Sequence, residues 1–387
     1  MGNGGSLFEN NLLEKINLLL TVGIYPPEIG GPATYVYSFA NWLNNKENFE
    51  IAVATASYHD IIDSVFYVHK VKKKKKLLWH INFFFMVLSK IKHFDTIYFN
   101  GLYIESFLAS ILRGKKYCVR IPGDQIWERW FYKDGNDLNI DEFQHLKGSL
   151  KIRLLRKIRK TYLNKAEKVI APSKYLAKLI EGWGIDKDKI EVVYNPYLDV
   201  KSEKIDLDIL KKKTFKIVTG GRLVKWKGVE EVIKACVMLN DINLIIVGDG
   251  PERASLTRFV KTLNMESRVV FTGIISRGQL KTVFEESDCF VLNSQYEGLP
   301  HIVLESMHSN CPVAVSRAGG NIEVVNHKET GLLFNVNSVN EIEESIKIFQ
   351  ENKSLTKEII RNAKTRIGKK FNRDIQFEKT VKIISDF

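Results

Sequence analysis

Apolar runs that alternate with helical patterns constrain the fold of this chain more than any other feature. In the first half the runs occupy residues 15–22, 51–56, 95–99, 117–121, 169–171 and 190–194. In the second half they occupy residues 215–219, 243–247, 268–271, 289–292 and 312–315. Strands that alternate with helices predict parallel sheets covered by helices on both faces, so we expect a doubly wound α/β fold.

A polar segment interrupts this alternation near the middle of the chain. Asn195, Pro196 and Tyr197 precede a polar run at residues 199–213, after which the strand and helix patterns begin again. The length of 387 residues also exceeds what one core usually supports. We therefore predict two Rossmann-like domains facing a cleft, at residues 1–198 and 199–370, and a C-terminal helix at 371–387 that packs back on the first domain.

Composition narrows the class of protein. With 44% apolar and 27% charged residues, the chain has the composition of an ordinary globular protein. No apolar run approaches the roughly 20 residues that cross a bilayer. The four cysteines lie far apart in apolar sequence, which favours buried thiols in a reducing cytoplasm over disulfides or a zinc site. The net charge of +13 fits a nucleic-acid partner, an anionic membrane or simple solubility.

Two glutamates eight positions apart mark the strongest candidate site. Glu297 follows the apolar run at 289–292, and Pro300 suits the first position of a helix that would carry Glu305 in its second turn. Both acids are then expected near a strand's C-terminal end, where open α/β sheets bind ligands. An acid at a helix start is also stabilised by the helix dipole, by about 0.3–1 kcal/mol, without any function. Glu305 is too deep in the helix for that explanation.

A glycine-rich basic loop follows the first strand of the second half. Gly220 and Gly221 allow close backbone approach, Arg222 offers a planar fork and Lys227 a point charge, which together suit a diphosphate. Such cations in a surface loop are otherwise ordinary solvated charges. In the first half, Gly30 and Gly31 follow the first strand and precede a helix opened by Pro32, which indicates either a ligand loop or a tight turn.

Three segments of the first half indicate surface functions. Residues 70–85 run from the lysine cluster that begins at Lys70 into an aromatic stretch that ends at Phe85, which is typical either of a helix on an anionic membrane or of a buried helix with a basic end. Residues 147–168 form a second basic amphipathic pattern. Residues 122–148 are interpreted as a long polar and aromatic loop that could cover an acceptor.

The motifs in their order resemble glycosyltransferase family 4, whose members have the two-domain GT-B fold. The matching motifs of the second half are Gly221-Arg222-Leu223 with Lys227-Gly228, Gly248-Asp249-Gly250-Pro251, Val270-Phe271-Thr272-Gly273, the Glu297 and Glu305 pair, and Gly319-Gly320 with Glu329-Thr330-Gly331-Leu332-Leu333. Those of the first half are residues 25–31, Ala171-Pro172-Ser173 and Tyr194-Asn195. The resemblance covers nearly the whole chain.

This resemblance implies an acceptor-binding first domain and a second domain that binds a UDP- or GDP-linked sugar. The sugar would be transferred with retention of configuration and without a metal or other cofactor. Arg222 and Lys227 would hold the donor phosphates, Glu297 would contact the transferred sugar, and Glu305 would accept hydrogen bonds from the ribose. The remaining donor-binding residues would be Gly30, Gly31, Gly221, Gly273, Gly298, Leu299, Pro300 and His301.

The chain departs from the family at one position. Many members carry a histidine near the reacting carbon, at the end of the strand that here leads into Pro122, Gly123 and Asp124. Asp124 is therefore the candidate for acceptor contact or for the base, and the alternative is that the acceptor's proton passes directly to the leaving phosphate. Acid pairs at residues 186–188 and 206–208 match a metal-binding spacing, but they fall in a turn and in the linker, so we expect no metal site.

The leading hypothesis is a cytoplasmic enzyme, peripheral on the inner face of the membrane, that glycosylates a lipid-linked or polysaccharide acceptor. The near alternative is a nucleotide-sugar epimerase or a sugar phosphorylase of the same fold. The remote alternative is a basic protein that binds nucleic acid without catalysis. No recognisable nucleic-acid module occurs, so no nucleic-acid partner is expected.

Overall fold

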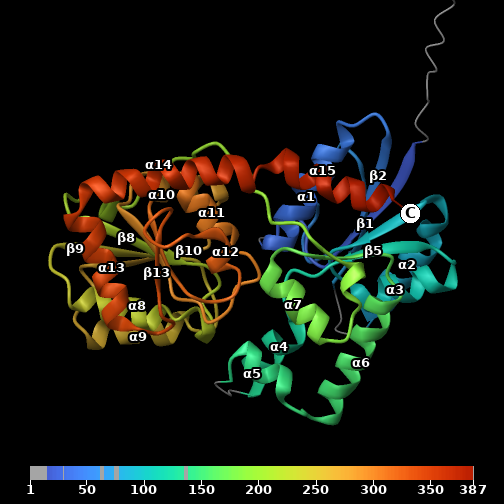
Figure 1. The fold of residues 1–387 in the computed structure, drawn as a ribbon, viewed down its shortest axis with the longest axis horizontal. Coiled ribbons are helices and arrows are strands. Elements are labelled where there is room, and N and C mark those ends of the chain that lie inside the picture. The colour runs from blue at the N-terminus through green and yellow to red at the C-terminus, as the bar shows by residue number, and fades with distance from the viewer. Residues whose placement is uncertain (1–14, 29, 62–64, 74–77, 135–137, 387) are drawn as a thin grey trace, which may run out of the picture. The chain divides into compact units, whose positions relative to one another are not determined.

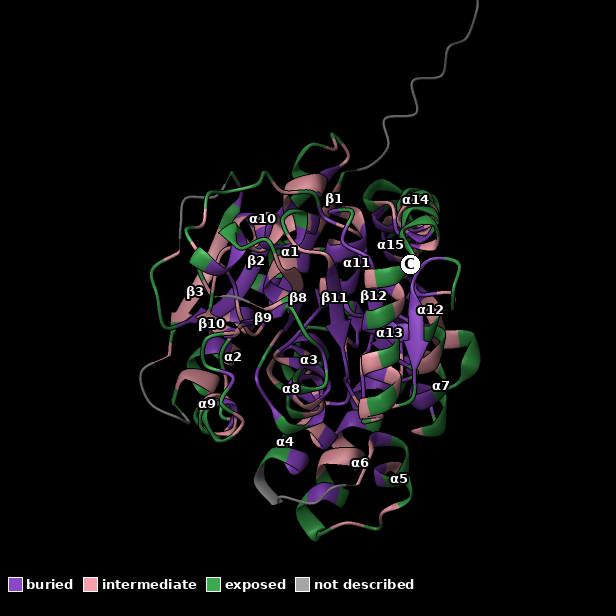
Figure 2. Cartoon of the chain, turned by 90° about the vertical axis from the view of Figure 1, so that its left-hand side faces the viewer, coloured by how far each residue is buried: buried purple, intermediate pink, exposed green. Residues whose placement is uncertain are grey.

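The computed structural model describes residues 15–386 except 29, 62–64, 74–77 and 135–137. Within these residues the chain forms two sheets of parallel strands, with a helix between most pairs of successive strands (Figure 1). The strands are the most deeply buried elements, whereas helices such as α13 (Val339–Glu351) expose one side (Figure 2). The predicted doubly wound α/β class is confirmed.

Seven strands of the described chain form the first sheet, in the order β3-β2-β1-β4-β5-β6-β7. Their bounds are β1 Ile16–Val22, β2 Phe49–Ser57, β3 Tyr67–Lys72, β4 Thr96–Phe99, β5 Lys116–Arg120, β6 Val169–Ala171 and β7 Ile190–Val192. The central β1 reads Ile-Asn-Leu-Leu-Leu-Thr-Val and is buried over its last five residues, as expected for a strand covered on both faces. The edge strand β3 was not predicted, because its lysines and partial exposure hide it from an apolar pattern.

Six described strands form the second sheet, in the order β10-β9-β8-β11-β12-β13. Their bounds are β8 Phe215–Gly220, β9 Ile242–Val247, β10 Val269–Gly273, β11 Cys289–Leu292, β12 Val313–Ser316 and β13 Leu332–Phe334. The predicted apolar runs match the first five within two residues. The chain reverses its direction of strand addition between β10 and β11, so the carboxyl ends of β8 and β11 border the switch point where such sheets bind ligands.

The helices cover these sheets and carry the polar side chains of interest. Their bounds are α1 Gly31–Asn44, α2 Leu78–Lys90, α3 Tyr103–Leu112, α4 Gln125–Asp134, α5 Ile140–His145, α6 Leu150–Asn164, α7 Lys174–Gly182, α8 Val229–Val237, α9 Arg253–Thr262, α10 Arg277–Glu285, α11 His301–His308, α12 Asn321–Val324, α14 Lys353–Lys370 and α15 Arg373–Ser385.

Contacts between residues divide the chain into two compact units. The first unit contains Met1–Arg120, Lys165–Lys168 and Lys382–Phe387, and the second contains Ile121–Asn164 and Val169–Val381. Helices α4, α5 and α6 therefore group with the second sheet. The predicted boundary at residue 198 and the predicted return of residues 371–387 to the first domain remain predictions.

Two sequence interpretations of the first half need correction. Residues 122–148 are not one long loop, because α4 and α5 lie within them. Residues 70–85 do not form one basic helix: Lys70 and Lys72 belong to β3, and the aromatic part belongs to α2. The Lys73 side chain is mostly buried, and its Nζ pairs with Glu28 Oε2 at 3.1 Å. Lys74, Lys75 and Lys76 lie outside the described residues.

Two expectations about the whole chain can also be compared with the structure. All four cysteines are buried free thiols, as predicted. Among the residues described, no helix combines the length and apolar character needed to cross a membrane.

Candidate active site

Lys227 and Glu297 meet at the carboxyl ends of β8 and β11. Lys227 ends a short 3-10 helix, Lys225–Lys227, and its Nζ forms an ion pair with Oε1 of Glu297. Ser294 Oγ donates to the same oxygen at 2.6 Å. Both side chains are mostly buried, with 17% of Lys227 and 13% of Glu297 exposed. The predicted cation and the predicted acid therefore form one preorganised pair.

The backbone around this pair is packed too tightly for side chains. A Cβ on Gly298 would collide with the carbonyl oxygen of Pro122, and a Cβ on Gly319 would collide with the carbonyl oxygen of Glu297. The amide of Gly320 donates to that same Glu297 oxygen at 2.7 Å. Glycine at residue 298 therefore lets the segment after β11 lie directly against the segment that leads into α4.

The remaining loop residues of the second unit are more open. Arg222 is exposed. Gly221 and Gly273 have φ of +124° and +70°, which L side chains rarely adopt, and a Cβ on either would meet nothing within 4 Å. Both glycines thus allow a backbone conformation that other residues rarely adopt, and the space beside them at the strand ends is open.

The start of α11 matches the prediction closely. Pro300 is the N-cap, His301 is the first helical residue, and no side chain caps the helix. Leu299 is buried, and its carbonyl accepts from Asn195 Nδ2 at 2.8 Å. The amides at this helix start lack a side-chain cap, which leaves them suited to an anionic group.

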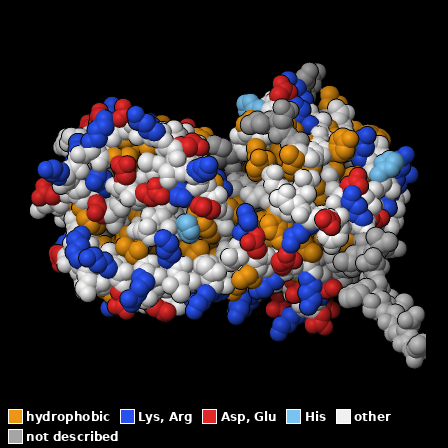
Figure 3. Space-filling model, turned by 90° about the horizontal axis from the view of Figure 1, so that it is seen from above, with side chains coloured by type: hydrophobic (Ala, Val, Ile, Leu, Met, Phe, Trp, Pro, Cys, Tyr) orange, Lys and Arg blue, Asp and Glu red, His pale blue; other side chains and the backbone are white. Residues whose placement is uncertain are grey.

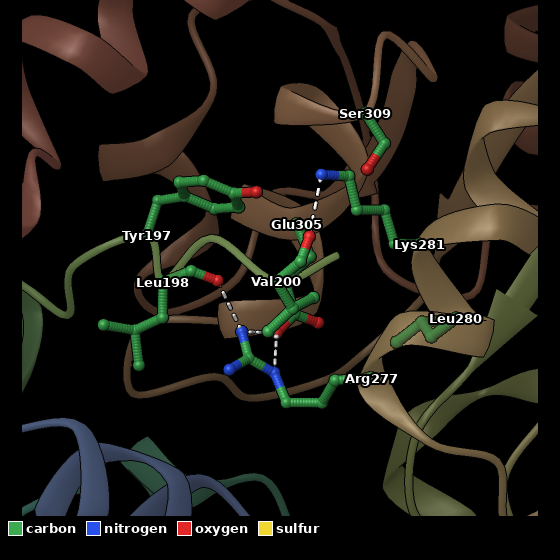
Figure 4. A pocket seen from close by; sticks show the side chains of 8 residues that line it. All are labelled: Tyr197, Leu198, Val200, Arg277, Leu280, Lys281, Glu305 and Ser309. Carbon is green, nitrogen blue, oxygen red and sulfur yellow. Dashed lines mark hydrogen bonds and ion pairs between the residues drawn. The ribbon is translucent and has the colours of Figure 1, made fainter. Parts of the chain in front are cut away.

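Glu305 lies in the second turn of α11, as predicted, but it is already paired. Arg277 donates to Glu305 Oε1 from Nε at 2.9 Å and from Nη2 at 2.7 Å, and also from Nη2 to the carbonyl of Leu198 at 2.9 Å. Burial raises the pKa of Glu305, and Arg277 opposes that shift. Figure 4 shows the pair at a pocket lined by Tyr197, Leu198, Val200, Arg277, Leu280, Lys281, Glu305 and Ser309. A ribose that used Glu305 would share it with Arg277, a partner that the sequence did not reveal.

Asp124 does not have the surroundings predicted for a base. It is fully buried, and its Oδ1 accepts from Arg159 Nη1 at 2.7 Å and from the amides of Ile126 and Trp127 at 3.0 and 3.3 Å. Its Oδ2 accepts from Gln144 Nε2 at 3.2 Å. A carboxylate so enclosed holds the start of α4 in place, which argues against Asp124 as the group that takes the acceptor's proton. Contact of Asp124 with the acceptor stays a prediction.

Glu128, one turn further along α4, is a site residue that the sequence analysis missed. Burial and the nearby Asp124 raise its pKa to about 7, while Lys227 and Arg222 act in the opposite direction. No motif surrounds Glu128, so the only signal was its place within the aromatic stretch after Pro122.

Gly30 and Gly31 lie in the other unit. A Cβ on Gly30 would lie 2.6 Å from Cδ1 of Ile24, and Gly31 is the first residue of α1, with Pro32 in its first turn. The predicted strand, glycine loop and proline-opened helix are therefore present. The role of these glycines in binding a donor remains a prediction.

No group of three or more His, Cys, Asp or Glu side chains within the described part of the chain is placed to hold a metal ion. The acid pairs at 186–188 and 206–208 lie at two separate 3-10 turns, Lys187–Lys189 and Asp208–Lys211. Metal independence of the reaction remains an expectation.

Two protein-family models match this chain. The model described as Glycosyltransferase Family 4 matches residues 29–197, and the model described as Glycosyl transferases group 1 matches residues 201–366. The chain belongs to glycosyltransferase family 4. The two matches meet near the polar segment after residue 195 and together span most of this family 4 glycosyltransferase.

Known relatives match either nearly the whole chain or about half of it. An uncharacterized glycosyltransferase of Methanocaldococcus jannaschii is 29% identical over 381 residues, covering 93% of this chain and 96% of its own. A Campylobacter jejuni enzyme, N-acetylgalactosamine-N,N'-diacetylbacillosaminyl-diphospho-undecaprenol 4-alpha-N-acetylgalactosaminyltransferase, is 30% identical over 206 residues, covering 52% of this chain and 56% of its own.

Solved structures share the fold of this family 4 glycosyltransferase. HepE of Anabaena, solved in complex with UDP-glucose, aligns with a TM-score of 0.77 at 18% identity and covers 96% of this chain and 100% of its own. Sucrose-phosphate synthase of Thermosynechococcus elongatus aligns with a TM-score of 0.78 at 17% identity. The alignment covers 95% of this chain and 98% of the synthase chain. The predicted GT-B fold is confirmed.

The raised pKa of Glu128 predicts how stability depends on pH in this glycosyltransferase. The folded protein holds the Glu128 proton up to a pKa of about 7, against an ordinary 4.5 in the unfolded chain. Wild-type stability therefore falls as the pH rises from 4.5 to 7, by up to about 3 kcal/mol. Glu128→Gln removes that loss, so we expect it to melt above the wild type at pH 8 and close to it at pH 5.

Thermal unfolding at the two pH values measures this difference. Glu286→Gln, which changes an exposed glutamate of the same unit, provides the control and should leave the melting temperature nearly unchanged. If the difference in melting temperature between Glu128→Gln and the wild type is the same at pH 5 and pH 8, the Glu128 carboxyl titrates normally.

Proposed function

We propose that this chain transfers a sugar from a UDP- or GDP-linked donor to a glycan acceptor, with retention of configuration and without a metal. The observation that carries the proposal is the buried pair of Lys227 and Glu297 at the switch point of the second sheet, beside Arg222. A cation suits the diphosphate and an acid suits the hydroxyls of the sugar attached to it. The complex of HepE with UDP-glucose supports this class of donor.

The proposed roles follow from the charge that develops during transfer. A departing nucleoside diphosphate gains negative charge, so cations fixed beside it act mainly in the transition state. Lys227 is held in place by Glu297 before the donor arrives, and therefore needs little reorganisation. The uncapped amides at the start of α11 add partial positive charge for the same phosphates.

The acceptor is proposed to be a lipid-linked or polysaccharide glycan. Support comes from the Campylobacter jejuni relative, whose name gives as its acceptor a sugar linked through a diphosphate to undecaprenol. A nucleotide-sugar epimerase or a phosphorylase of the same fold is the competing enzyme. Product analysis separates them, since an epimerase alters the donor sugar with no acceptor present and a phosphorylase requires inorganic phosphate.

A panel of UDP- and GDP-sugars tests the proposal. The purified protein is incubated with each donor in EDTA, and thermal shift and release of the nucleoside diphosphate are recorded. One donor is expected to raise the melting temperature by mass action and to be hydrolysed slowly or transferred. Turnover that appears only after Mg²⁺ or Mn²⁺ is restored would refute metal independence, and no turnover of any donor would refute the glycosyltransferase assignment of this site.

The exposed apolar face of α2 and α3 supports the proposed location at an anionic membrane. Leu78, Ile81 and Phe85 of α2 are 45–59% exposed, and the exposed residues of α3 are Ile104, Leu108, Ile111 and Leu112. The two helices pack side by side within the first unit, joined by the pair of His80 and Glu105. The exposed Lys90 is the last residue of α2, and the exposed Arg113 directly follows α3. The two helices therefore combine apolar and basic groups, as membrane-surface helices do.

Liposome flotation tests this surface. The wild type is expected to float with vesicles of phosphatidylglycerol, and Phe85→Ser with Leu108→Ser should lose most of that binding, because two exposed apolar side chains no longer enter the interface. Met238→Ser, which changes an exposed side chain of the second unit, should float like the wild type. Equal recovery with neutral phosphatidylcholine would contradict a preference for anionic lipid, and unchanged flotation of the double variant would contradict contact through this face.

The charge distribution on the face drawn in Figure 3 does not support the alternative that this chain binds nucleic acid. On the face drawn in Figure 3, Lys and Arg side chains are scattered among Asp and Glu and form no continuous stripe. Lys70 and Lys73 pair with Asp60 and Glu28, which removes part of the lysine cluster from free contact with phosphates.

A further inference from the structure

Glu128 occupies the space that a side chain at residue 123 would need. A Cβ on Gly123 would lie 2.8 Å from Oε1 of Glu128 and 3.1 Å from the hydroxyl oxygen of Tyr296. The Glu128 carboxylate and the Tyr296 hydroxyl therefore converge above the backbone of Gly123. This place is the end of the polar turn between β5 and α4, one residue before the buried Asp124.

Aromatic packing fixes α4 to the loop that carries Lys227. Trp127 lies 5.4 Å from Trp226 between ring centroids, and Phe131 lies 5.3 Å from the same indole. Trp226 directly precedes Lys227 in the chain. Trp127 also contacts the ring of Tyr296, which directly precedes Glu297, at 5.4 Å. The helix that presents Glu128 thus packs on the neighbours of both members of the central ion pair.

The charges that face Glu128 come from three segments. Lys227 and Arg222 of the basic loop favour its carboxylate, whereas Asp124 at the start of α4 and Glu297 after β11 disfavour it. Tyr296 adds a buried hydroxyl that has no hydrogen-bond partner among the described residues. A carboxyl beside two cations and an unsatisfied buried hydroxyl marks a place where a further polar group would be bound.

We propose that Glu128 is the catalytic residue that accepts the proton of the acceptor hydroxyl. The inference rests on the proposed function. The acceptor oxygen forms a bond to the anomeric carbon, the bond from that carbon to the diphosphate oxygen breaks, and its electron pair leaves on the phosphate. The acceptor's proton passes to the Glu128 carboxylate. In a single displacement with retention the acceptor approaches from the side of the leaving phosphate, and Glu128 faces Arg222 and Lys227, the two cations proposed to hold that phosphate.

Three variants test this role in the full-length protein. Glu128→Gln keeps the shape and removes the base, Glu128→Asp keeps a carboxylate, and Arg129→Gln changes the exposed neighbour on the same helix. The probe is whichever UDP- or GDP-sugar of the panel is turned over, with water as the acceptor. Release of the nucleoside diphosphate is followed from pH 5 to pH 9, and the donor dissociation constant is measured separately.

The expected result is specific to a base. Glu128→Gln should lose about 10²-fold in kcat while its donor dissociation constant stays within about twofold, because general base catalysis contributes in the chemical step alone. The wild-type rate should rise through pH 7 and level off, Glu128→Gln should lose that rise, and Glu128→Asp should recover part of the rate. Arg129→Gln should match the wild type.

Two results would overturn the assignment, and they differ from failure of the function itself. If Glu128→Gln turns over the donor at the wild-type rate and with the same pH profile, Glu128 is not the base. A loss of donor affinity as large as the loss of rate would make Glu128 a donor-binding residue. Absence of turnover by the wild type with every donor would instead refute the proposed function, and this inference with it.

Discussion

Lys227→Ala is expected to lower kcat for donor turnover by about 10²–10³, the largest effect of any single substitution proposed for this chain. Lys227 is the cation held by Glu297 beside the uncapped start of α11, so its removal leaves the departing diphosphate with less stabilisation when its charge develops. The affinity of the Lys227→Ala variant for the free nucleoside diphosphate should also fall, because a contact with the bound phosphate is lost in the ground state. Steady-state kinetics and competitive inhibition by UDP or GDP measure both effects.

Lys225→Ala is the matched control for this substitution. Lys225 is an exposed lysine in the same 3-10 helix, two residues away, whereas Lys227 is mostly buried and forms the ion pair with Glu297. It should retain nearly wild-type kinetics. Equal losses in the two variants would show that the loop needs only net positive charge, and circular dichroism of Lys227→Ala checks that the fold is intact.

Glu297→Gln should lower kcat/KM for the sugar nucleotide by about 10- to 100-fold, the range of a hydrogen bond to a charged group. Glu297 accepts from Lys227 and Ser294 through Oε1, and its other oxygen is proposed to accept from hydroxyls of the transferred sugar. The nucleoside diphosphate lacks that sugar. We therefore expect the inhibition constant for UDP or GDP to change far less than kcat/KM.

The comparison of sugar nucleotide with nucleoside diphosphate separates the two proposed roles. Lys227→Ala should weaken both ligands, whereas Glu297→Gln should weaken mainly the one that carries the sugar. Glu286→Gln, an exposed change in the same unit, should alter neither. If Glu297→Gln weakens both ligands equally, Glu297 acts by holding Lys227 rather than by contacting the sugar.

The local sequence was sufficient to predict those site residues whose positions are set by the adjacent strand or helix. The apolar run before residue 293 and Pro300 were enough to place Glu297 in a loop and Glu305 in the second turn of α11. The same holds for the basic loop after β8, because its glycines and cations follow directly on the end of a strand that the apolar pattern had located. The pairing of Lys227 with Glu297 follows from β8 and β11 being neighbours in a doubly wound sheet.

Long-range packing decided the features that the sequence did not predict. Asp124 sat at the right strand end for a base, but Arg159 and Gln144 approach from helices far along the chain and enclose it. The position of Glu128 near the Lys227 loop could not be predicted, because it depends on the packing of Trp127 on Trp226 and on the room that Gly123 leaves for the Glu128 carboxyl. Arg277 could likewise not be assigned to Glu305 before α10 and α11 were placed.

Isothermal titration of the donor in EDTA, comparing the wild type with the Arg222→Ala and Lys227→Ala double variant, tests most directly whether these residues hold one activated sugar. We expect the wild type to bind its UDP- or GDP-sugar without metal and the double variant to bind at least about 100-fold more weakly, since each cation makes charge-assisted contacts with the diphosphate. Equal dissociation constants for the two proteins would contradict the account.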